Sequence, residues 1–358
     1  MTDENKQILI EKVELPAAAI AQSLISGFTD AEQQNPQHGL DWLQNLTQHA
    51  LDDGDGAVIY IARTSPDNFV ALPLKRHTGG RKLEALSTFY TSAFAPTVVS
   101  SEPTALFCAL FKHLRTKEKI TQLTLAPLEE ESPVFDQLQQ AFKDAGFAAV
   151  HSYFCFANWS HPLPQLEEGY LAYLDTRPSR LRNTIKRKTK SFLKEGRGSM
   201  KMITDVAALP EAIAEFTKVY NNSWKREEPY PDFIPQLLHL AAKRGWLRLG
   251  IASYDGAPIA GQIWLVCDNS AYIFKLAYDE QFKTLSAGTV VTAFMMEHVI
   301  DQDRVERIDY LSGDDAYKRD WMSVRRERQG IAAYNPDSLS GGTMTIVHYL
   351  KRLVKRER

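Results

Sequence analysis

The sequence predicts an α/β protein of the α+β type with two domains, each a mainly antiparallel sheet flanked by helices. The chain has 358 residues, which is more than one average domain of roughly 150 residues. Short β-rich segments separated by turn residues occur in both halves, and each set is followed by a helix and a further strand. Pro162 and Pro164 lie between the halves, so we expect domains over 1–165 and 166–358.

The sequence of the first half predicts an irregular start, then two helices, and then elements in the order β-β-β-α-β-α-β. A Ser-Pro-Asp-Asn turn and a Gly-Gly turn separate the first three strands, which form an antiparallel meander. Pro103 begins one later helix, and Ser132 with Pro133 begins the other, because proline fits the first helical turn. The expected helices are 17–27, 40–51, 103–114 and 133–146, and the expected strands are 58–63, 69–75, 82–87, 121–127 and 148–159.

The second half predicts the same succession of three strands, a helix and a strand. Asp255 and Gly256 separate two apolar runs and are typical of a hairpin turn. A final basic helix over 345–358 places apolar residues on one face, which favours a packed helix with a solvated basic edge. The expected helices are 167–194, 206–224 and 287–300 with a short helix after 311, and the expected strands are 200–204, 246–254, 258–267, 271–278, 307–311 and 323–333.

The composition indicates an ordinary soluble globular protein, and we expect a cytoplasmic one. Charged residues make up 24% of the chain and aromatic residues 10%, with no low-complexity tract. Cys108, Cys155 and Cys267 lie in apolar runs at spacings that fit neither a disulfide framework nor a zinc site, so we expect free thiols and no metal. The apolar stretches are shorter than the roughly 18 residues of a membrane span. The sequence does not indicate an oligomeric state.

Charge is divided unevenly between the halves. Residues 1–165 carry 12 basic and 19 acidic side chains and the rest carries 30 and 25, a balance of −7 against +5. Nine of the basic residues lie within 177–197, beside a single glutamate. This pattern favours an anionic partner for the second half, such as a phosphorylated cofactor, tRNA or an anionic lipid. The alternatives are charge complementarity between the halves and a merely solvated helix face.

Four blocks within 177–321 carry a resemblance to a known fold family. They are RPSRLRNTIKRKTKSFLKEG, DGAPIAGQI, LAYDEQFKTLSAGTVV and IDYLSGDDAYKRDW, and the last fits a D-x-x-x-G-D-x-x-Y-K-x-x-W pattern. In this order they resemble the GNAT-type acyltransferases, and in particular the Fem-type aminoacyltransferases and the CelD/BcsL-like acetyltransferases linked to exopolysaccharide and cellulose biosynthesis. The resemblance implies two tandem GNAT-like domains, of which the first, 1–165, matches only in element order and is degenerate.

The resemblance implies an acyl-CoA co-substrate, with acetyl-CoA as the expected form, at the helix that begins near Ser286. Ser286, Ala287, Gly288 and Thr289 are small, and backbone N–H groups at a helix start suit a pyrophosphate. Tyr278 ends the strand that would lie beside the pantetheine arm. The family's Ser-Pro-Gly has lost its proline here, and the stricter Gly-rich signature of simple GNAT enzymes is absent. Two alternatives therefore remain, namely an ordinary helix capped by Ser286 and an aminoacyl-tRNA donor.

The D-x-x-x-G-D-x-x-Y-K-x-x-W block supplies the expected catalytic residues. Acyl transfer to an amine needs a base and positive charge near the oxyanion. Asp309 and Asp315, beside Asp314, are the candidate bases, and Tyr317 is a candidate proton donor to the leaving thiolate. By analogy with the Fem-type enzymes, Lys318 is the expected electrostatic residue. The structural alternatives are helix caps, a packing pair and a surface ion pair.

Aromatic and charged residues in two segments are expected to contact the acceptor. They are Trp224, Arg226 and Tyr230 in NNSWKREEPYPDF, and Trp321 in the last block; loop packing explains them equally well. The leading hypothesis is an N-acyltransferase that moves an acyl group from acyl-CoA to an amino group of a small molecule, sugar, peptide or cell-envelope precursor. The alternatives are an aminoacyl-tRNA-dependent ligase acting on a peptidoglycan precursor and a non-catalytic tandem-GNAT binding protein.

Overall fold

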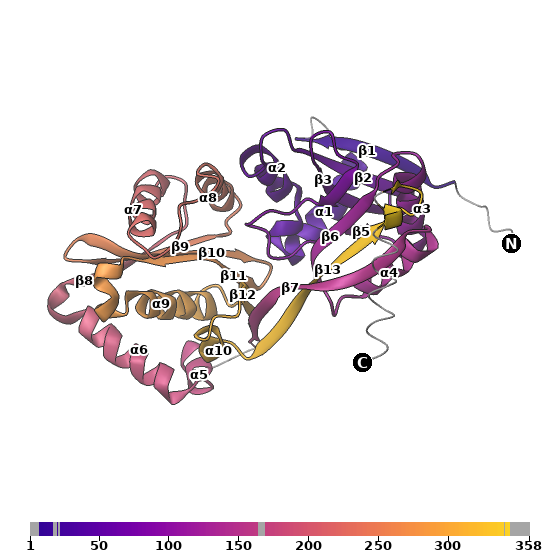
Figure 1. Cartoon of the computed structure of the whole chain (residues 1–358). Coiled ribbons are helices and arrows are strands. Elements are labelled where there is room, and N and C mark those ends of the chain that lie inside the picture. Colours follow the sequence, from indigo (N-terminus) through magenta and orange to yellow (C-terminus); the bar gives the residue numbers. More distant parts are fainter. Residues whose placement is uncertain (1–6, 17–19, 21, 164–168, 340, 344–358) are drawn as a thin grey trace. The chain divides into compact units, whose positions relative to one another are not determined.

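A computed structural model describes residues 7–16, 20, 22–163, 169–339 and 341–343. The chain divides into two compact units, shown with their elements in Figure 1. Unit 1 comprises residues 1–156 and 327–358, and unit 2 comprises residues 157–326. The division differs from the expected domains because strand β13 (Val324–Tyr334) pairs with strand β6 (Gln122–Glu129) and so returns the end of the chain to unit 1.

Unit 1 is a mixed sheet with helices packed against it. Its strand order is β1-β2-β3-β4-β6-β13, with β5 paired to β3; β4 and β6 are parallel and the other recorded pairs are antiparallel. The expected meander is confirmed, but strand β1 lies in the segment expected to be irregular. The other elements are β1 (Leu9–Leu15), α1 (Gln22–Gln34), α2 (Leu40–His49), β2 (Gly56–Ser65), β3 (Asn68–Arg76), β4 (Lys82–Ala85), β5 (Thr97–Val99), α3 (Pro103–Thr116), α4 (Pro133–Asp144) and β7 (Ala148–Pro162), whose last residues belong to unit 2.

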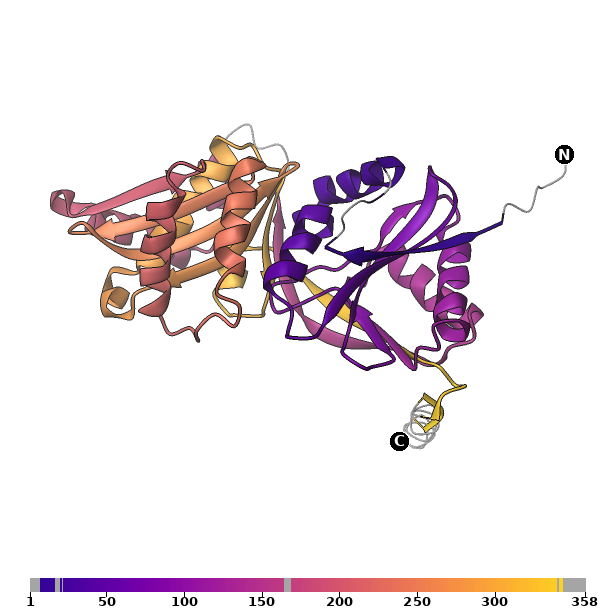
Figure 2. The ribbon, with the colours of Figure 1, turned by 90° about the horizontal axis from the view of Figure 1, so that it is seen from above.

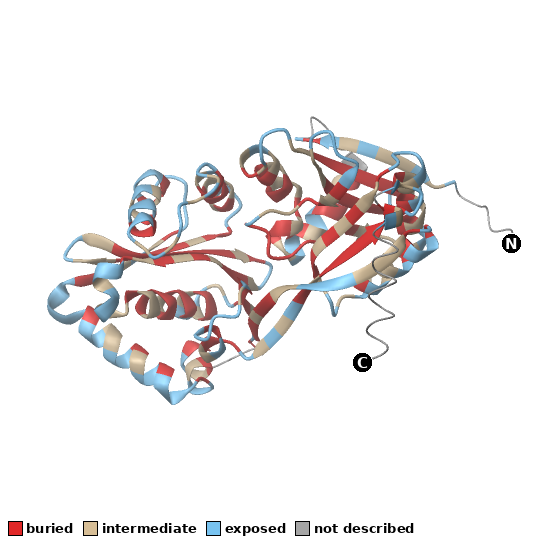
Figure 3. Cartoon of the chain, in the orientation of Figure 1, coloured by how far each residue is buried: buried red, intermediate tan, exposed pale blue. Residues whose placement is uncertain are grey.

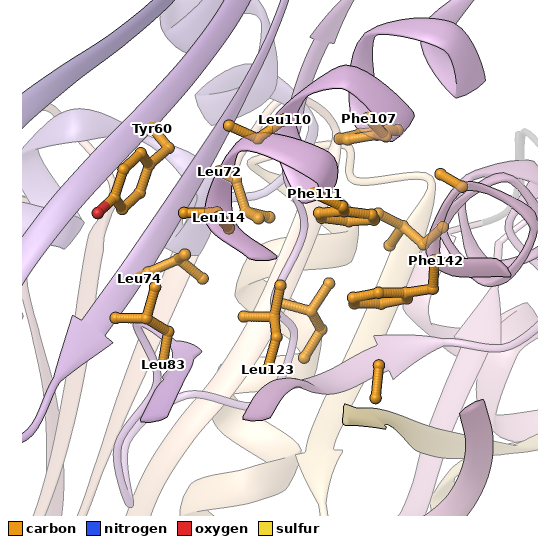
Figure 4. Packing of buried hydrophobic residues seen from close by; sticks show 14 of the residues in the cluster. Tyr60, Leu72, Leu74, Leu83, Phe107, Leu110, Phe111, Leu114, Leu123 and Phe142 are labelled. Carbon is orange, nitrogen blue, oxygen red and sulfur yellow. The ribbon is translucent and has the colours of Figure 1, made fainter. Parts of the chain in front are cut away.

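The core of unit 1 lies between its sheet and helices α3 and α4. Phe111 of α3 stacks on Phe142 of α4 at 4.1 Å between ring centroids, and Leu72 and Leu74 of β3 belong to the same buried cluster (Figure 4). Aromatic stacking adds to the burial of apolar area, which is the main stabilising contribution to folding.

Unit 2 has the strand order β12-β11-β10-β9-β8, and the end of β7 pairs with β12. Helices α7 and α8 lie on one face of this sheet, as Figures 1 and 2 show, and α9 lies on the other. Figure 3 shows α9 buried along nearly its whole length. The elements are α5 (Gly169–Asp175), α6 (Ser179–Phe192), β8 (Gly198–Ile203), α7 (Leu209–Asn221), α8 (Phe233–Lys243), β9 (Leu247–Tyr254), β10 (Ala257–Cys267), β11 (Ser270–Tyr278), α9 (Ala287–Asp301), β12 (Arg307–Ser312) and α10 (Lys318–Trp321).

Local signals explain most of unit 2. Asp255 and Gly256 both have positive φ and join β9 to β10, so the expected hairpin is confirmed. The expected helix over 167–194 is interrupted before Ser179, because Pro178 disfavours a helical conformation at the residue before it. The expected helix over 345–358 lies outside the described residues. In the described ranges, no helix combines the length and apolar character that a bilayer span needs, and no group of histidine, cysteine and carboxylate residues could hold a metal ion.

Candidate acyl-transfer site

Strands β11 and β12 run parallel, pair briefly and then separate. Ser270–Tyr272 pairs with Arg307–Asp309, and no further pair between the two strands is recorded among the described residues, although β11 continues to Tyr278. Beyond the paired segment, the facing edges of both strands carry backbone N–H and C=O groups that the partner strand does not satisfy. Such edges favour a ligand with amide groups that can complete the hydrogen bonding.

Asp309 accepts three hydrogen bonds at the point where the pairing of β12 with β11 ends. One carboxylate oxygen accepts from the Leu311 amide at 2.7 Å and from the Asn158 side chain at 2.6 Å, and the other accepts from Arg307 at 2.7 Å. Leu311 has a φ of 55°, and the pairing with β7 shifts register between Asp309 and Ser312, as in a β-bulge. Asp309 is 2% exposed. Its carboxylate therefore fixes a strained bulge at the end of β12.

Lys318, the first residue of α10, is buried beneath the same strand end. Its ammonium donates to the carbonyl oxygens of Ser312, Tyr310 and Gly313, the last two at 3.4 Å. Asp315 lies 3.6 Å from it, and the side chain of Lys318 is 5% exposed. Burial lowers the pKa of Lys318 while Asp315 opposes that change. One ammonium thus joins three carbonyls that converge where β12 ends.

Tyr317 and Asp315 lie on the solvent side of this cluster. The Tyr317 ring stands edge-on to Tyr310 with centroids 5.7 Å apart, and the residue is 41% exposed. Burial of its hydroxyl and the neighbouring Asp315 raise the pKa of Tyr317, so the phenol keeps its proton at neutral pH. The side chain of Asp315 is 62% exposed. Asp315 and part of the Tyr317 side chain are therefore accessible to a ligand.

Asp314 is held on the outside of the turn. It accepts from the Trp159 indole at 2.7 Å and from Arg325 at 2.9 Å. The hydrogen bonds from Arg325 and then from Trp159 lower the pKa of its carboxyl group. These contacts anchor the turn to β7 and β13.

The start of α9 lacks a side-chain cap among the described residues. Ser286 adopts a left-handed conformation with φ 55°, and in the described part of the chain its hydroxyl caps no amide. Its carbonyl accepts from Thr289 and Val290, whereas no acceptor among the described residues is recorded for the amides of Ala287 and Gly288. Two amides at the positive end of a 15-residue helix form a favourable place for a phosphate. The alternative of a helix capped by the Ser286 hydroxyl does not match this geometry.

Two expected binding regions meet at Tyr278. A Cβ at Gly288 would lie 3.2 Å from the Tyr278 ring, so the end of β11 abuts the start of α9. Trp224, in the loop between α7 and α8, places its ring centroid 4.5 Å from that of Tyr278 and is 50% exposed. The structure therefore brings a residue expected to bind the acceptor beside residues expected to bind the co-substrate.

The other residues expected to bind the acceptor are placed differently. Arg226 is exposed, and its carbonyl accepts from the Tyr220 hydroxyl at 3.2 Å; Tyr230 is half-buried in the same loop. Trp321 is 4% exposed in the core of unit 2, and its carbonyl accepts from Tyr173 at 2.7 Å. We therefore keep Arg226 and Tyr230 as proposed acceptor contacts and propose a packing role for Trp321.

Sequence reasoning missed a buried ion pair near this loop. Lys275 of β11 pairs with Glu228 of the α7–α8 loop, and their side chains are 8% and 16% exposed. The Lys275 ammonium also lies 4.9 Å from the centroid of the Tyr220 ring. The strand alternates buried and less buried positions, and Lys275 occupies a buried one. A lysine on the apolar face of a strand is the signal that could have indicated a partner.

Lys225 is a second group that the sequence did not single out. Its ammonium lies 5.8 Å from the Trp224 ring and 5.9 Å from the Tyr220 ring. Burial, followed by the charge of Lys275, lowers the pKa of Lys225 to about 8. Lys318 lowers it further and Asp315 opposes the change. The α7–α8 loop, β11 and the α10 turn thus contribute their charged groups to one region of unit 2.

The lowered pKa of Lys225 gives an expected pH dependence of stability. Between pH 8 and about 10.4 the unfolded chain holds a proton on this lysine that the folded chain releases, so the free energy of unfolding gains a component that rises with pH. Below pH 8 both states are protonated and that component is constant. Chemical denaturation of Lys225→Met at pH 7.5, 9 and 10 is expected to lack this rise, whereas Lys218→Met, at an exposed position on α7, keeps it. Equal pH slopes for Lys225→Met and the unsubstituted protein would contradict the assignment.

The separated strands, the uncapped helix start and the two units of sheet and helices fit a GNAT fold in two tandem halves. Residues 179–319 match the acetyltransferase (GNAT) domain family. No curated protein matches the chain at a significant level.

Solved structures show the same fold over nearly the whole chain. FemX has 11% sequence identity and a TM-score of 0.59, and the match covers 91% of this chain and 98% of FemX. A conserved protein of unknown function from Bacteroides thetaiotaomicron has 14% identity and a TM-score of 0.55, over 82% of this chain and 89% of that one. A tandem GNAT protein from the clavulanic acid biosynthesis pathway has 15% identity and a TM-score of 0.51, over 92% and 100%. The resemblance to Fem-type and tandem GNAT proteins is thus confirmed for the fold.

Proposed function

We propose that unit 2 transfers an acyl group from acyl-CoA, in the simplest case acetyl-CoA, to an amino group of an acceptor. The observation that carries the proposal is the uncapped start of α9 beside Tyr278, at the end of the strand from which β12 has separated. The match of residues 179–319 to the acetyltransferase (GNAT) domain family supports it.

We propose a position for each part of the donor. The amides of Ala287 and Gly288 would hold the pyrophosphate. Lys188 of α6 adds positive charge there, since its ammonium donates to the Thr284 carbonyl at 2.5 Å, two residues before Ser286. The free edge of β11 would hydrogen-bond the amides of the pantetheine arm and direct the thioester toward the charged groups of the α10 turn.

The reaction joins the amine nitrogen to the thioester carbonyl carbon. A C–N bond forms, the C–S bond breaks, the thiolate leaves with the electron pair, and the attacking ammonium loses a proton because only the neutral amine is nucleophilic. We propose that exposed Asp315 accepts that proton and that Tyr317 donates one to the thiolate. Both oxygens of Asp309 already accept hydrogen bonds, so we propose a positioning role for it.

Lys318 has a related role. Its ammonium has three carbonyl acceptors, so direct hydrogen bonding to an oxyanion would require it to exchange a partner. We propose that Lys318 fixes the turn and contributes a positive charge beside the developing oxyanion, in a buried environment that screens the charge weakly.

A charge introduced at the start of α9 tests the donor site. Thr289→Glu is expected to raise the dissociation constant for acetyl-CoA at least about tenfold, because its carboxylate repels the phosphates. The same carboxylate is favourable for the helix itself, so thermal stability is expected not to fall. Thr289→Gln is the uncharged control of matched size. Equal affinities of the two variants in calorimetric titrations would place the phosphates elsewhere.

The second candidate donor is aminoacyl-tRNA, and the exposed basic face of α6 is the observation that favours it. Arg182, Lys186, Arg187 and Lys190 are exposed on this helix. Titration of the purified protein with acetyl-CoA and, separately, with aminoacyl-tRNA distinguishes the two. Saturable acetyl-CoA binding with thiol release on addition of an amine supports the proposed donor. Salt-sensitive tRNA binding without acetyl-CoA binding supports the second candidate. Binding of neither would favour a non-catalytic protein.

A further inference from the structure

Unit 2 contains a pocket of about 370 Å³ between α7, α8 and the loop that joins them. Figures 1 and 2 show the two helices side by side on one face of the sheet. Both helices contribute apolar side chains, namely Ile213, Phe216, Ile234 and Leu238. A pocket of this size, with apolar walls and few polar groups, is typical of a site for a small organic molecule.

The charged groups that line the pocket lie in the loop, and both are acidic. Glu227 and Glu228 both line it, and Lys275 neutralises Glu228. Glu227 is exposed, and no ion pair is recorded for it among the described residues. The pocket therefore has one uncompensated carboxylate at the edge of an apolar cavity, an arrangement complementary to a cation with an apolar body.

The pocket adjoins the acyl-transfer site. Tyr220 lines the pocket and also contacts the ammonium groups of Lys275 and Lys225 through its ring. Trp224, in the loop that follows α7, contacts the ring of Tyr278. A molecule that occupies the pocket with its apolar part therefore has its charged end next to the loop that borders the proposed thioester position.

We propose that this pocket binds the acceptor and that the acceptor is an amphiphilic primary amine, with an apolar body between α7 and α8 and its ammonium at Glu227. The identification of this amine as the acceptor rests on the proposed function, but the binding of the amine to the pocket does not depend on acyl transfer. An acceptor that is a fully hydroxylated sugar or a polyanion would lack the apolar part and the positive charge that the pocket recognises.

The first experiment measures binding without any acyl donor. NMR titration with n-hexylamine, n-hexanol and hexanoate is expected to give affinities in that order. Thr217→Trp places a large side chain at an exposed residue that lines the pocket, and it is expected to weaken hexylamine binding at least about tenfold by filling the cavity. Ala214→Trp adds the same side chain at an exposed position of α7 outside the pocket and is expected to leave binding unchanged.

The second experiment tests the charge. Glu227→Gln is expected to weaken hexylamine binding about fivefold, in line with a partly exposed ion pair, and to leave hexanol binding unchanged. Glu211→Gln, the same change at an exposed residue of α7, is the control. The proposal is overturned if hexanoate binds as well as hexylamine or if Thr217→Trp binds hexylamine normally.

Acetyl-CoA titration of the same variants separates this proposal from the proposed function. If Thr217→Trp weakens hexylamine binding but the protein binds no acetyl-CoA, the pocket is supported as an amine-binding site and acetyl-CoA is rejected as the donor. If the protein transfers acetyl groups from acetyl-CoA to an amine and Thr217→Trp does not change the rate, acyl transfer is supported and the pocket is rejected as the acceptor site.

Discussion

Replacing Lys318 with alanine is expected to lower the free energy of unfolding by about 3 kcal/mol and the transfer rate on the order of 100-fold. The loss of stability follows because the carbonyls of Tyr310, Ser312 and Gly313 would lose their shared donor in a buried region. The loss of rate follows because the positive charge nearest the end of β12 disappears. Chemical denaturation and initial rates at saturating acetyl-CoA measure the two effects.

Two further variants separate the structural part from the catalytic part. Lys318→Met keeps the length of the side chain without its charge, so it is expected to regain part of the stability and none of the rate. Lys243→Ala, at an exposed position of α8, is expected to change neither. If transfer by folded Lys318→Met falls less than about tenfold, Lys318 is structural and carries no catalytic charge.

The parts of the fold set by local chemistry could be predicted from the sequence. Asp255 and Gly256 specify the hairpin because both positions need positive φ, and small residues identify the start of α9. Helix α8 was missed because Pro229, Pro231 and Pro235 make its segment resemble a loop, although Pro235 lies in the first turn, where proline is tolerated.

The parts of the site set by tertiary contacts could not be predicted. Lys275 and Glu228 are 47 residues apart in the chain, and only the packing of the α7–α8 loop on the sheet brings them together. Asp309 matches the motif and was therefore expected as a candidate base. Its function in holding the Leu311 bulge depends on Asn158, from the other side of the unit boundary expected near residue 165. A sequence motif identifies such residues, whereas the structure shows which groups each side chain contacts.

The pair of Glu228 and Lys275 is expected to show strong energetic coupling. Glu228→Gln removes the carboxylate that pairs with a buried ammonium, and Lys275→Met removes the ammonium that pairs with this carboxylate, so each is expected to lower the free energy of unfolding by about 3 kcal/mol. The double variant carries neither charge of the pair and is expected to lie within about 1 kcal/mol of the original protein, because two neutral side chains of similar size avoid the desolvation cost. Denaturant unfolding of the original protein, the two single variants and the double variant gives the coupling energy of the pair in a double-mutant cycle.

Transfer rates of the same four proteins show whether the pair serves catalysis or only folding. Glu228 lines the pocket and Lys275 lies on the strand proposed to hold the donor, so the pair links the two proposed binding regions. We expect the double variant to recover stability but to stay at least about tenfold slower, since the loop that carries Trp224 would no longer be fixed to β11 by charge. Recovery of the rate together with stability would instead show that the ion pair is only a structural contact, and that shape alone positions the acceptor loop.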